Sequence, residues 1–458
     1  MTITDPATSV SGLVERPATL IIGAGIAGIQ AALDIADAGY QVYLVEKDPS
    51  VGGRMSQLDK TFPTLDCSAC ILTPKMVDVD RHPNIELLTY SEVVEVVETS
   101  EGFRATIRKK PRYVDVDTCT GCGECAANCR MTGRIVGQFD AGMGKRAAIY
   151  VPFPQAVPLK YTIDPDACLY LTRGTCGKTF KCKDACPADA IDFEMQEELI
   201  QRDVQAVIVA IGFDVVDAAV KPELGYGTYP EVITGLEFER LVSSSGPTVG
   251  KIMIGDQVPQ DIIFIHCVGS RDRSIDHPWC SRVCCMYTAK QAHLAHERIP
   301  GVNVTVFYMD IRAFGKGFEE FYDRVREEGA LYRRGNPAEV LRQNGRLLVR
   351  AEDTILGEFI ELEADLVVLA VGLQPRSETL QLAEMLDLEL SPDGFFKEQH
   401  HKMRPVDTDR PAVFLAGCAQ GPKDIPDTVA QAKAAAASAM IVMRQVEQAA
   451  TDPVPVRG

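Results

Sequence analysis

The stretch from Ala18 to Gly28 reads ATLIIGAGIAG and decides the fold. It predicts an apolar strand, followed by the spacing Gly23-x-Gly25-x-x-Gly28 and a segment of helical periodicity, IQAALDIADAG. Gly23 permits a tight turn, Gly25 lets a diphosphate approach the backbone, and Gly28 lets the helix pack on the strand. The pattern predicts a dinucleotide-binding unit that holds the diphosphate at the helix N-terminus, where free N–H groups favour anions.

A second strand and its terminal acid extend this unit. The strand QVYLVE ends at Glu46, 18 residues after Gly28. The carboxylate is placed to accept hydrogen bonds from both ribose hydroxyls of a dinucleotide. A plain helix–strand contact that favours glycine would explain neither the second strand nor the acid. The same pattern binds FAD and NAD, so the two cofactors can be distinguished only from later segments of the sequence.

Two later segments favour FAD. KDPSVGGRMSQL, after Glu46, resembles the loop that holds FAD in flavoproteins with two dinucleotide-binding folds. The strand AVFLAG and an Ala-rich helix expected from about Thr428 resemble the C-terminal FAD segment of that class, although Cys418 stands where Asp is usual. VIVAIGF and VVLAVGLQP resemble its domain-crossover loops. The expected FAD-binding residues are Gly23, Gly25, Gly28, Glu46, Lys47, Gly53, Arg54, Gly212, Gly372, Gly417 and Cys418.

Composition and charge exclude several classes of function. The chain of 458 residues has 64 acidic and 47 basic residues and a net charge of -17, which repels nucleic-acid phosphates. No apolar run reaches the roughly 18 residues that a membrane helix needs. The first residues, MTITDPATSV, lack the basic region of a signal peptide. We therefore expect a cytoplasmic protein without nucleic-acid or membrane partners.

Fifteen cysteines in such a compartment indicate metal binding or redox chemistry rather than structural disulfides. Cys119-x2-Cys122-x2-Cys125-x3-Cys129 is the spacing of bacterial ferredoxins. A second run of four cysteines, Cys168, Cys176, Cys182 and Cys186, ends directly before Pro187. In two-cluster ferredoxins the fourth Cys of each run ligates the other cluster. The expected [4Fe–4S] ligand sets are Cys119, Cys122, Cys125 and Cys186 for one cluster, and Cys129, Cys168, Cys176 and Cys182 for the other.

A third cysteine set occupies the position where a second nucleotide motif would lie. The strand DIIFIH is followed by Cys267 without further glycines in register, and then by Cys280, Cys284 and Cys285. Cys280 and Cys284, four residues apart, are expected on one face of a helix start. Four sulfurs can hold an iron–sulfur cluster. Zinc ligation and simple burial of thiols are the alternatives.

The combination resembles the A subunit of heterodisulfide reductase over nearly the whole chain. The resemblance lies in the cysteine pattern and in segments such as LDKTFPTLDCSACILTPKM and AIYVPFPQAVPLKYTID. It implies a homodimeric flavoprotein that passes electrons between FAD, three [4Fe–4S] clusters and B and C subunits, with the disulfide chemistry on the B subunit. Long members carry a further N-terminal domain and a C-terminal ferredoxin region, which this sequence is expected to lack, and some bifurcate electrons at the FAD.

The resulting fold prediction is an α/β flavoprotein with two dinucleotide-binding domains, similar to thioredoxin reductase, and an inserted two-cluster ferredoxin (α+β) module. The expected boundaries are 1–110, 195–250 and 376–458 for the FAD domain, 111–194 for the ferredoxin module, and 251–375 for the cluster-bearing second domain.

No acid–base catalytic residue stands out, which fits a chain that transfers electrons. Cys67 and Cys70 lie after the FAD loop and leave two interpretations: an electron-transfer or cluster role, or a structural thiol pair. They also support a rival function, a self-contained NAD(P)H-dependent disulfide reductase. A third hypothesis is a scaffold that only docks other redox subunits. Lys423 and Asp424 are candidates to reach the flavin or to form a plain turn.

Overall fold

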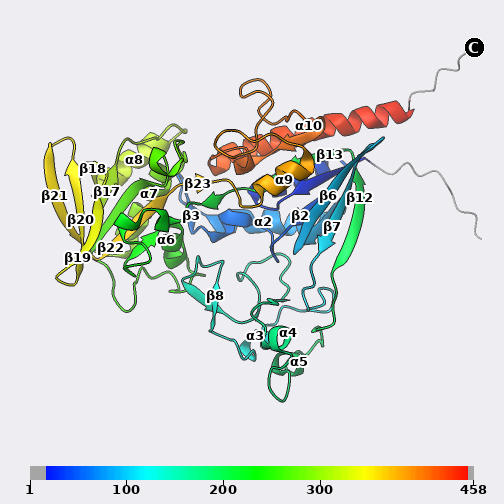
Figure 1. The fold of residues 1–458 in the computed structure, drawn as a ribbon, viewed down its shortest axis with the longest axis horizontal. Helices are drawn as coiled ribbons and strands as arrows, with labels where there is room; N and C mark the ends of the chain where they lie inside the picture. The colour runs from blue at the N-terminus through cyan, green and yellow to red at the C-terminus, as the bar shows by residue number, and fades with distance from the viewer. Residues whose placement is uncertain (1–16, 452–458) are drawn as a thin grey trace, which may run out of the picture.

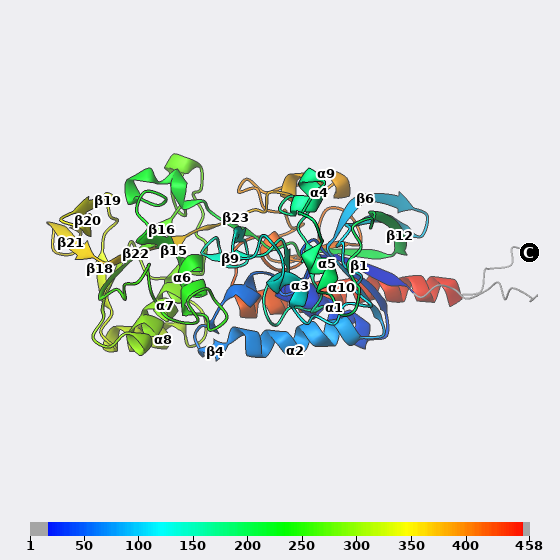
Figure 2. The ribbon, with the colours of Figure 1, turned by 90° about the horizontal axis from the view of Figure 1, so that it is seen from below.

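The computed structural model describes residues 17–451, which form two α/β domains side by side and a small module beneath them (Figure 1). The second domain lies at one end of the long axis and the first domain at the other, and the view from below agrees (Figure 2). Residues 1–10, the basis of the prediction against a signal peptide, lie outside the described part.

The first domain is built on a parallel sheet of order β24-β13-β1-β2-β5. The predicted strand–helix–strand unit is confirmed, because β1 and β2 pair in parallel on either side of α1 in the sequence. The helix α1 buries the Ala- and Ile-rich face of its sequence against α10. The bounds are β1 (Ala18–Ile22), α1 (Ile26–Asp37), β2 (Gln41–Glu46), α2 (Ser68–Arg81), β5 (Ile85–Thr89), β13 (Ala206–Val209), β24 (Val413–Leu415) and α10 (Ile425–Thr451).

An antiparallel sheet of order β12-β7-β6 covers this domain, as the alternating pattern of residues 86–110 predicts. Its strands are β6 (Ser91–Thr99), β7 (Gly102–Lys109) and β12 (Glu198–Val204). The connection from β7 to β12 carries the inserted module. Smaller elements are η1 (Gly53–Gln57), β3 (Lys60–Thr61), β4 (Asp66–Cys67), β14 (Asp214–Val215), η2 (Ala218–Val220), η3 (Pro222–Leu224), β23 (Leu373–Gln374), α9 (Thr379–Leu386) and η5 (Gly417–Ala419).

The second domain repeats the design with a parallel sheet of order β15-β22-β16-β17-β18 and an antiparallel sheet β19-β20-β21. β15 and α6 belong here, so the expected boundary at residue 250 falls too late. The bounds are β15 (Val232–Thr234), α6 (Gly235–Val242), β16 (Asp261–Val268), η4 (Arg273–Ile275), α7 (Cys284–Arg298), β17 (Asn303–Tyr308), α8 (Phe318–Glu327), β18 (Leu331–Arg334), β19 (Glu339–Gln343), β20 (Arg346–Asp353), β21 (Glu358–Ala364) and β22 (Leu366–Val371).

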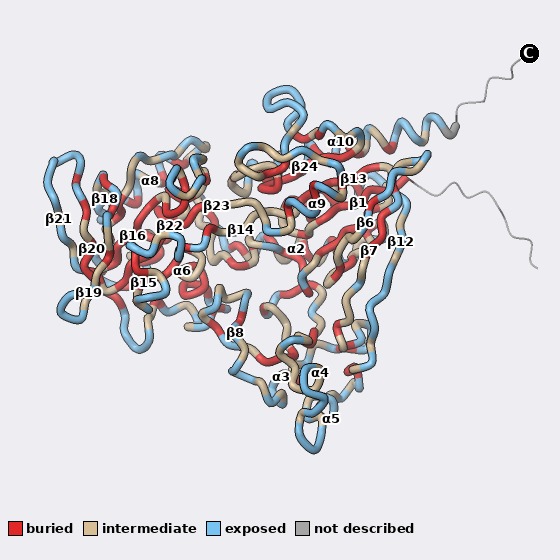
Figure 3. The backbone as a smooth tube through the Cα atoms, viewed as in Figure 1, coloured by how far each residue is buried: buried red, intermediate tan, exposed pale blue. Residues whose placement is uncertain are grey.

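The inserted module has short elements and a small core that includes Cys119 and Cys125. Both large domains contain extensive buried stretches, whereas the end of the module around α4 and α5 is mostly exposed (Figure 3). No helix among residues 17–451 is both long enough and apolar enough to cross a membrane. The bounds are α3 (Glu124–Ala127), β8 (Ile135–Gly137), β9 (Gly144–Arg146), β10 (Ile149–Tyr150), β11 (Thr162–Ile163), α4 (Leu169–Arg173) and α5 (Lys181–Asp184).

Candidate functional site

The glycines after β1 form a cradle that larger residues would fill. Gly23 has φ +101°, and a β-carbon on Gly28 would lie 1.8 Å from the Gly23 carbonyl oxygen. A β-carbon on Gly53 would lie 2.9 Å from the Cα atom of Gly25, so the two loops approach closely. The N-terminus of α1 therefore remains open to a phosphate group, as the spacing predicts.

Glu46 lies buried at the end of β2, beside this cradle. Its carboxylate accepts hydrogen bonds from the backbone N–H groups of Ala24 (2.7 Å) and Asp48 (3.0 Å). Burial, followed by the charge of Asp48, raises the pKa of Glu46 to about 7, although these hydrogen bonds act in the opposite direction. The loop thus pre-positions one carboxylate for the hydroxyl groups of a bound nucleotide.

A pocket of about 460 Å³ runs from Glu46 to residues of the second domain, within the usual size range of ligand sites. The glycine cradle and Glu46 form one part of its wall, and α6 and α7 contribute another. Two buried polar atoms on this wall have no hydrogen-bond partner, namely Arg54 Nε and Gln291 Oε1. Buried polar atoms normally have partners, so this wall suits a polar ligand.

The structure brings most of the expected FAD-binding residues to this pocket. Lys47 and Arg54 line it while pairing with Glu378 (2.7 Å) and Asp214 (3.2 Å), respectively. The residues that line it are Gly23, Gly25, Glu46, Lys47, Gly53, Arg54, Gly212 and Cys418. The other three expected residues, Gly28, Gly372 and Gly417, lie outside its lining.

Gly28 and Gly417 instead allow neighbouring segments to pack closely behind the pocket. A β-carbon on Gly417, which has φ +68°, would lie 2.8 Å from the β-carbon of Ala27. Cys418 is buried, and burial raises the pKa of its thiol. Lys423 lines the pocket but donates to the carbonyl oxygens of Gly417 (2.8 Å) and Gly421 (2.7 Å), and burial lowers its pKa to about 8.

The third cysteine set converges at the start of α7, next to the pocket. Cys267 is the penultimate residue of β16 and has φ +58°, a conformation that non-glycine residues adopt rarely. Burial and then the neighbouring charges of Cys285 and Cys280 raise the pKa of Cys267 to about 12. Burial and the same cluster of thiols raise the pKa of Cys284 well above its usual value.

The expectation that Cys280 and Cys284 share a helix start is wrong. α7 begins at Cys284, and Arg282 between them has φ +62°, which turns the chain before the helix. The Ser281 backbone N–H donates to Ser270 Oγ (3.1 Å) and so ties this turn to the segment after Cys267. The sulfurs still interact electrostatically, because the turn folds back onto the end of β16.

Tyr287 joins the third cysteine set to the pocket. One turn along α7 from Cys284, it lines the pocket and donates to the Val371 carbonyl oxygen (3.0 Å), and burial followed by the charge of Cys284 raises its pKa. Val283 lines the pocket too. A group bound to these sulfurs would therefore be one side chain away from a group bound in the pocket.

Sequence reasoning missed a buried ion pair on the same wall. Lys290 and Glu239 are 1% and 3% exposed and pair with each other, and Glu239 also accepts from Gln291 Nε2 (2.7 Å). The available signal was a lysine six residues after Cys284, on a helix that also carries Met286, Ala289 and Leu294. Buried charges are costly unless paired, and such groups are enriched at functional sites.

The inserted module groups its cysteines across the two runs. Burial raises the pKa of Cys125 to about 12, and the charges of Cys119, Cys186 and Cys122 raise it as well. Cys186 comes from the second run, yet its sulfur acts on a thiol of the first. This is the grouping expected for the first ferredoxin-type site.

The other four cysteines line one small apolar pocket of their own. Its walls include Ile149, Tyr170, Phe180 and Phe193. Burial raises the pKa of Cys182 to about 11, followed by the charge of Cys129. The cysteines that line the pocket are Cys129, Cys168, Cys176 and Cys182.

The donor chemistry of all three sets suits a cationic metal centre. Thiolates that share a buried site repel one another, and coordination to a metal relieves that repulsion while deprotonating the ligands. Within residues 17–451, no three His, Cys, Asp or Glu side chains are arranged to hold a single metal ion. Each set consists of four cysteines, which is the ligand type that [4Fe–4S] clusters use.

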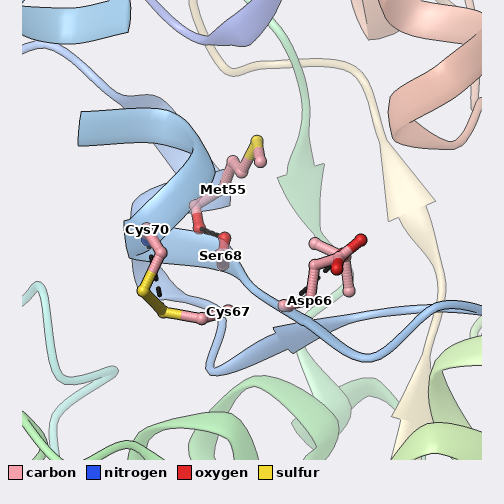
Figure 4. Close-up of a disulfide and its surroundings, with 6 residues drawn as sticks. Met55, Asp66, Cys67, Ser68 and Cys70 are labelled. Carbon is pink, nitrogen blue, oxygen red and sulfur yellow. Dashed lines mark hydrogen bonds between the residues drawn. A yellow bond between two sulfur atoms is a disulfide. The ribbon is translucent and has the colours of Figure 1, made fainter. Parts of the chain in front are cut away.

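Cys67 and Cys70 form a disulfide at the first turn of α2 (Figure 4). Both are exposed, and the Cys70 backbone N–H donates to Cys67 Sγ (3.2 Å). Cys67 pairs across β3–β4 with Lys60, a residue of the large pocket. Neither cysteine is part of the pocket lining in the described chain, so the pair lies beside the pocket rather than in it.

The fold and the pocket define a flavoprotein-type oxidoreductase with two dinucleotide-binding domains. Residues 19–65 match the family of FAD dependent oxidoreductases. Thioredoxin reductase from T. acidophilum is similar over 94% of this chain and 98% of its own, with TM-score 0.50 and 14% identity. The Lactococcus lactis enzyme covers 94% of this chain and 100% of its own, with TM-score 0.51 and 14% identity. The predicted α/β fold with two dinucleotide-binding domains is confirmed, and the ferredoxin character of the inserted module stays a prediction.

Sequence relatives narrow the class further. The CoB–CoM heterodisulfide reductase of Methanocaldococcus jannaschii has an iron-sulfur A subunit that is 54% identical over 93% of this chain and 64% of its own length. A protein of Archaeoglobus profundus, named for its likeness to the heterodisulfide reductase A subunit, is 48% identical over 92% of this chain and 65% of its own length. The chain is a homologue of the heterodisulfide reductase A subunits, and it spans less than two thirds of the length of these relatives.

Proposed function

We propose that this chain is an electron-transfer subunit of a heterodisulfide-reductase-like complex, with FAD in the large pocket and three [4Fe–4S] clusters on its cysteine sets. The observation that carries the proposal is the position of Tyr287, which lies on the pocket wall one helical turn after Cys284 of the third set. When bound, FAD exchanges two electrons at once or one at a time, and clusters exchange one.

Different residues of the pocket would bind different parts of FAD. The glycine cradle and the N-terminus of α1 would hold the diphosphate, and Glu46 would accept from the ribose hydroxyls. Arg54 and Gln291 would supply the donor and acceptor that lack partners now. Glu239 and Lys290 would form part of the pocket wall made by α6 and α7, where their charges compensate each other.

The sulfur sets would lead electrons between this pocket and the surface. The third set adjoins the pocket through α7, and the inserted module carries the other two sets in its small core. The relatives are named as subunits, and we infer that this chain also works with B- and C-type subunits, as a homodimer in the cytoplasm. Reduction of a disulfide or another sulfur compound would then take place on a partner.

A simple reduction experiment separates this function from the rival reductase, which the Cys67–Cys70 disulfide favours. Anaerobic protein with bound flavin is mixed first with NAD(P)H and then with a one-electron reductant such as titanium(III) citrate. We expect the flavin absorbance to persist with NAD(P)H and to bleach together with the cluster absorbance afterwards. Rapid bleaching by NAD(P)H would contradict the proposal.

The scaffold hypothesis requires a second readout. If the chain only docks other subunits, apoprotein without flavin would support the turnover of an assembled complex as well as the holoprotein does. We expect turnover to be lost with the flavin and to return when FAD is added back.

A further inference from the structure

A buried arginine lies at the point where the inserted module begins. Arg112 follows shortly after β7, from which the module extends beneath the first domain (Figure 1). The residue is only 5% exposed. Its guanidinium donates to the Pro49 carbonyl oxygen (2.8 Å) and Thr89 Oγ1 (2.6 Å) in the first domain, and to Thr162 Oγ1 (2.7 Å) in the module. Arg112 therefore joins the segment that follows Glu46 to the inserted module.

The charge of this arginine is not compensated by a carboxylate. Within residues 17–451, the buried Lys and Arg side chains are those of Arg112, Arg240, Lys290 and Lys423. Arg240 and Lys290 form ion pairs with carboxylates, and Lys423 lines the large pocket. In the same part of the chain, Arg112 has only neutral hydrogen-bond acceptors and no ion pair. Buried charges are normally paired or lie beside a metal centre, so this cation lacks a counter-charge.

The groups that act on Arg112 identify that counter-charge. Burial lowers the pKa of Arg112 to about 10, whereas the charges of Tyr90, Tyr150 and Cys119 raise it, so the guanidinium stays charged at neutral pH. Burial raises the pKa of Tyr90 to about 12 and also raises that of Tyr150, so both phenols are neutral. Cys119 is the remaining group, and its thiol becomes an anion when it binds a metal.

The backbone brings Arg112 to the same place. The Ile163 N–H donates to the Arg112 carbonyl oxygen (2.9 Å), and Ile163 packs with Cys119 and Cys125 in the small core of the module. Thr162, which accepts from the guanidinium, directly precedes Ile163. Contacts of the backbone and of the side chain therefore hold Arg112 against the core that contains the first sulfur set.

We propose that the buried charge of Arg112 is the counter-charge of a cluster held by Cys119, Cys122, Cys125 and Cys186, and that it raises the reduction potential of this cluster. The inference rests on the proposed function, which assigns a cluster to these thiols. When one electron passes from the bound flavin to this site, the flavin is oxidised by one electron and the site gains one negative charge. No bond forms or breaks, and no proton moves.

A fixed cation stabilises the added negative charge, and net charge is one of the factors that set cluster potentials. Because Arg112 is buried, dissolved salt screens its charge only weakly. Arg112 also contacts the first domain through Pro49 and Thr89, whereas the second set lies toward α4 and α5. The cation would therefore favour an electron on the cluster that is closer to the first domain.

The test changes the charge beside Arg112 without removing Arg112. Thr89→Asp places a carboxylate where Thr89 Oγ1 now accepts from the guanidinium. Thr89→Asn has nearly the same shape and no charge, and is the matched control. A second pair consists of Arg112→Met, which removes the cation, and Arg112→Lys, which keeps a cation with fewer hydrogen bonds. Each full-length variant is prepared anaerobically with its cofactors, and its iron and flavin contents are measured.

EPR-monitored redox titrations give the potential of each cluster, and the signal that Cys122→Ser loses identifies the first one. We expect Thr89→Asp and Arg112→Met to lower the potential of this signal alone. The shift should correspond to about a tenfold or larger change in the reduction equilibrium, which is about 59 mV for one electron. Thr89→Asn and Arg112→Lys should stay close to the unaltered chain, and the differences should persist at high salt.

Equal potentials in Thr89→Asp and Thr89→Asn would overturn the inference. An equal fall in all four variants would overturn it too, since lost hydrogen bonds and not lost charge would then be the cause. If Arg112→Met loses its iron, the Thr89 pair decides, because both of its members retain Arg112. Absence of the first cluster from the unaltered chain would instead contradict the proposed function, and this inference would fall with it.

Discussion

Tyr287 and Cys284 lie one helical turn apart on α7, and the Tyr287 hydroxyl, on the wall of the large pocket, donates to the Val371 carbonyl oxygen (3.0 Å). One helix thus presents a thiol at its first residue and a pocket-lining side chain at its fourth. In the proposed function, this sulfur set takes the place of a nicotinamide-binding motif. The second domain would then serve as a route for single electrons rather than as a nucleotide site.

Removing the hydroxyl group of Tyr287 tests this link. Once Cys284 binds iron, its sulfur can only accept a hydrogen bond, so the Tyr287 hydroxyl, which now donates to the Val371 carbonyl oxygen, would turn to donate to it, and hydrogen bonds to cluster sulfurs raise reduction potentials. We expect Tyr287→Phe to keep its iron and flavin while lowering the potential of one cluster in an EPR-monitored titration. Tyr229→Phe, in the same domain and outside the pocket lining, is the control. Identical potentials in all three proteins would show that the contact has no electronic role.

Glu46 predicts that FAD binding depends on pH. Burial raises its pKa to about 7, well above the ordinary value of a glutamate. An ionised carboxylate accepts from ribose hydroxyls, so the affinity of apoprotein for FAD should rise between about pH 6 and pH 8. Glu46→Gln should weaken binding by about tenfold to a hundredfold at pH 8, the value of a hydrogen bond to a charged group, and flatten this dependence. Flavin fluorescence quenching measures both effects.

The raised pKa of Glu46 also makes the stability of the apoprotein depend on pH. Stability should fall as the pH rises, whereas FAD affinity should increase. Because the folded pKa of Glu46 is raised, its contribution to apoprotein stability is fully present below about pH 4.5 and is lost as the pH rises through 7. Denaturant unfolding should show this loss between about pH 5 and pH 8 in the unaltered chain, and less of it in Glu46→Gln. Asp34→Asn, on α1, is the control. A pH-independent FAD affinity in the unaltered chain would contradict this role of Glu46.

The grouping of the ferredoxin-type cysteines predicts which substitutions act alike. Serine at Cys186 should remove the same EPR signal as serine at Cys122, because both thiols belong to the set around Cys125. Serine at Cys129 should instead match serine at Cys176, with which it shares a pocket. If Cys129→Ser matched Cys122→Ser, each run would hold its own cluster and the crossed grouping would be wrong.

We expect a large loss of folding stability when one partner of the buried Lys290–Glu239 ion pair is removed. Lys290→Met leaves the carboxylate of Glu239 buried without its cation, which should lower the free energy of unfolding by about 3–5 kcal/mol. Lys433→Met removes an exposed ion pair with Asp34 and should cost less than about 1 kcal/mol. Urea titrations of the two apoproteins give the comparison. Equal costs would mean that the buried pair is compensated elsewhere.

Much of the architecture was predictable because its signals are local. The Gly23–Gly28 spacing requires backbone geometry that only glycine supplies, and the strand ending at Glu46 is set by its own apolar pattern. The ferredoxin run is equally local. These segments are enough to predict the first domain, the edge of its sheet where a nucleotide binds, and the inserted module. None of these predictions depends on a contact between residues far apart in the sequence.

The features that sequence missed depend on tertiary contacts. The position of Cys280 outside the helix follows from the left-handed Arg282 and the hydrogen bond between Ser281 and Ser270, neither of which has a periodic signature. Likewise β15 joins the second sheet by pairing with β22, more than a hundred residues later, which shifts the domain boundary. Lys290 finds its partner Glu239 only when two helices pack.

We propose that twelve of the fifteen cysteines hold iron–sulfur clusters beside a flavin. The decisive experiment is anaerobic purification of the full chain, with iron, acid-labile sulfide, zinc and flavin quantified on the same sample. We expect about twelve iron and twelve sulfide per flavin, as three [4Fe–4S] clusters and one FAD require. Zinc in place of iron, or thiols at positions 267, 280, 284 and 285 that remain free to alkylating reagents in the native protein, would contradict it.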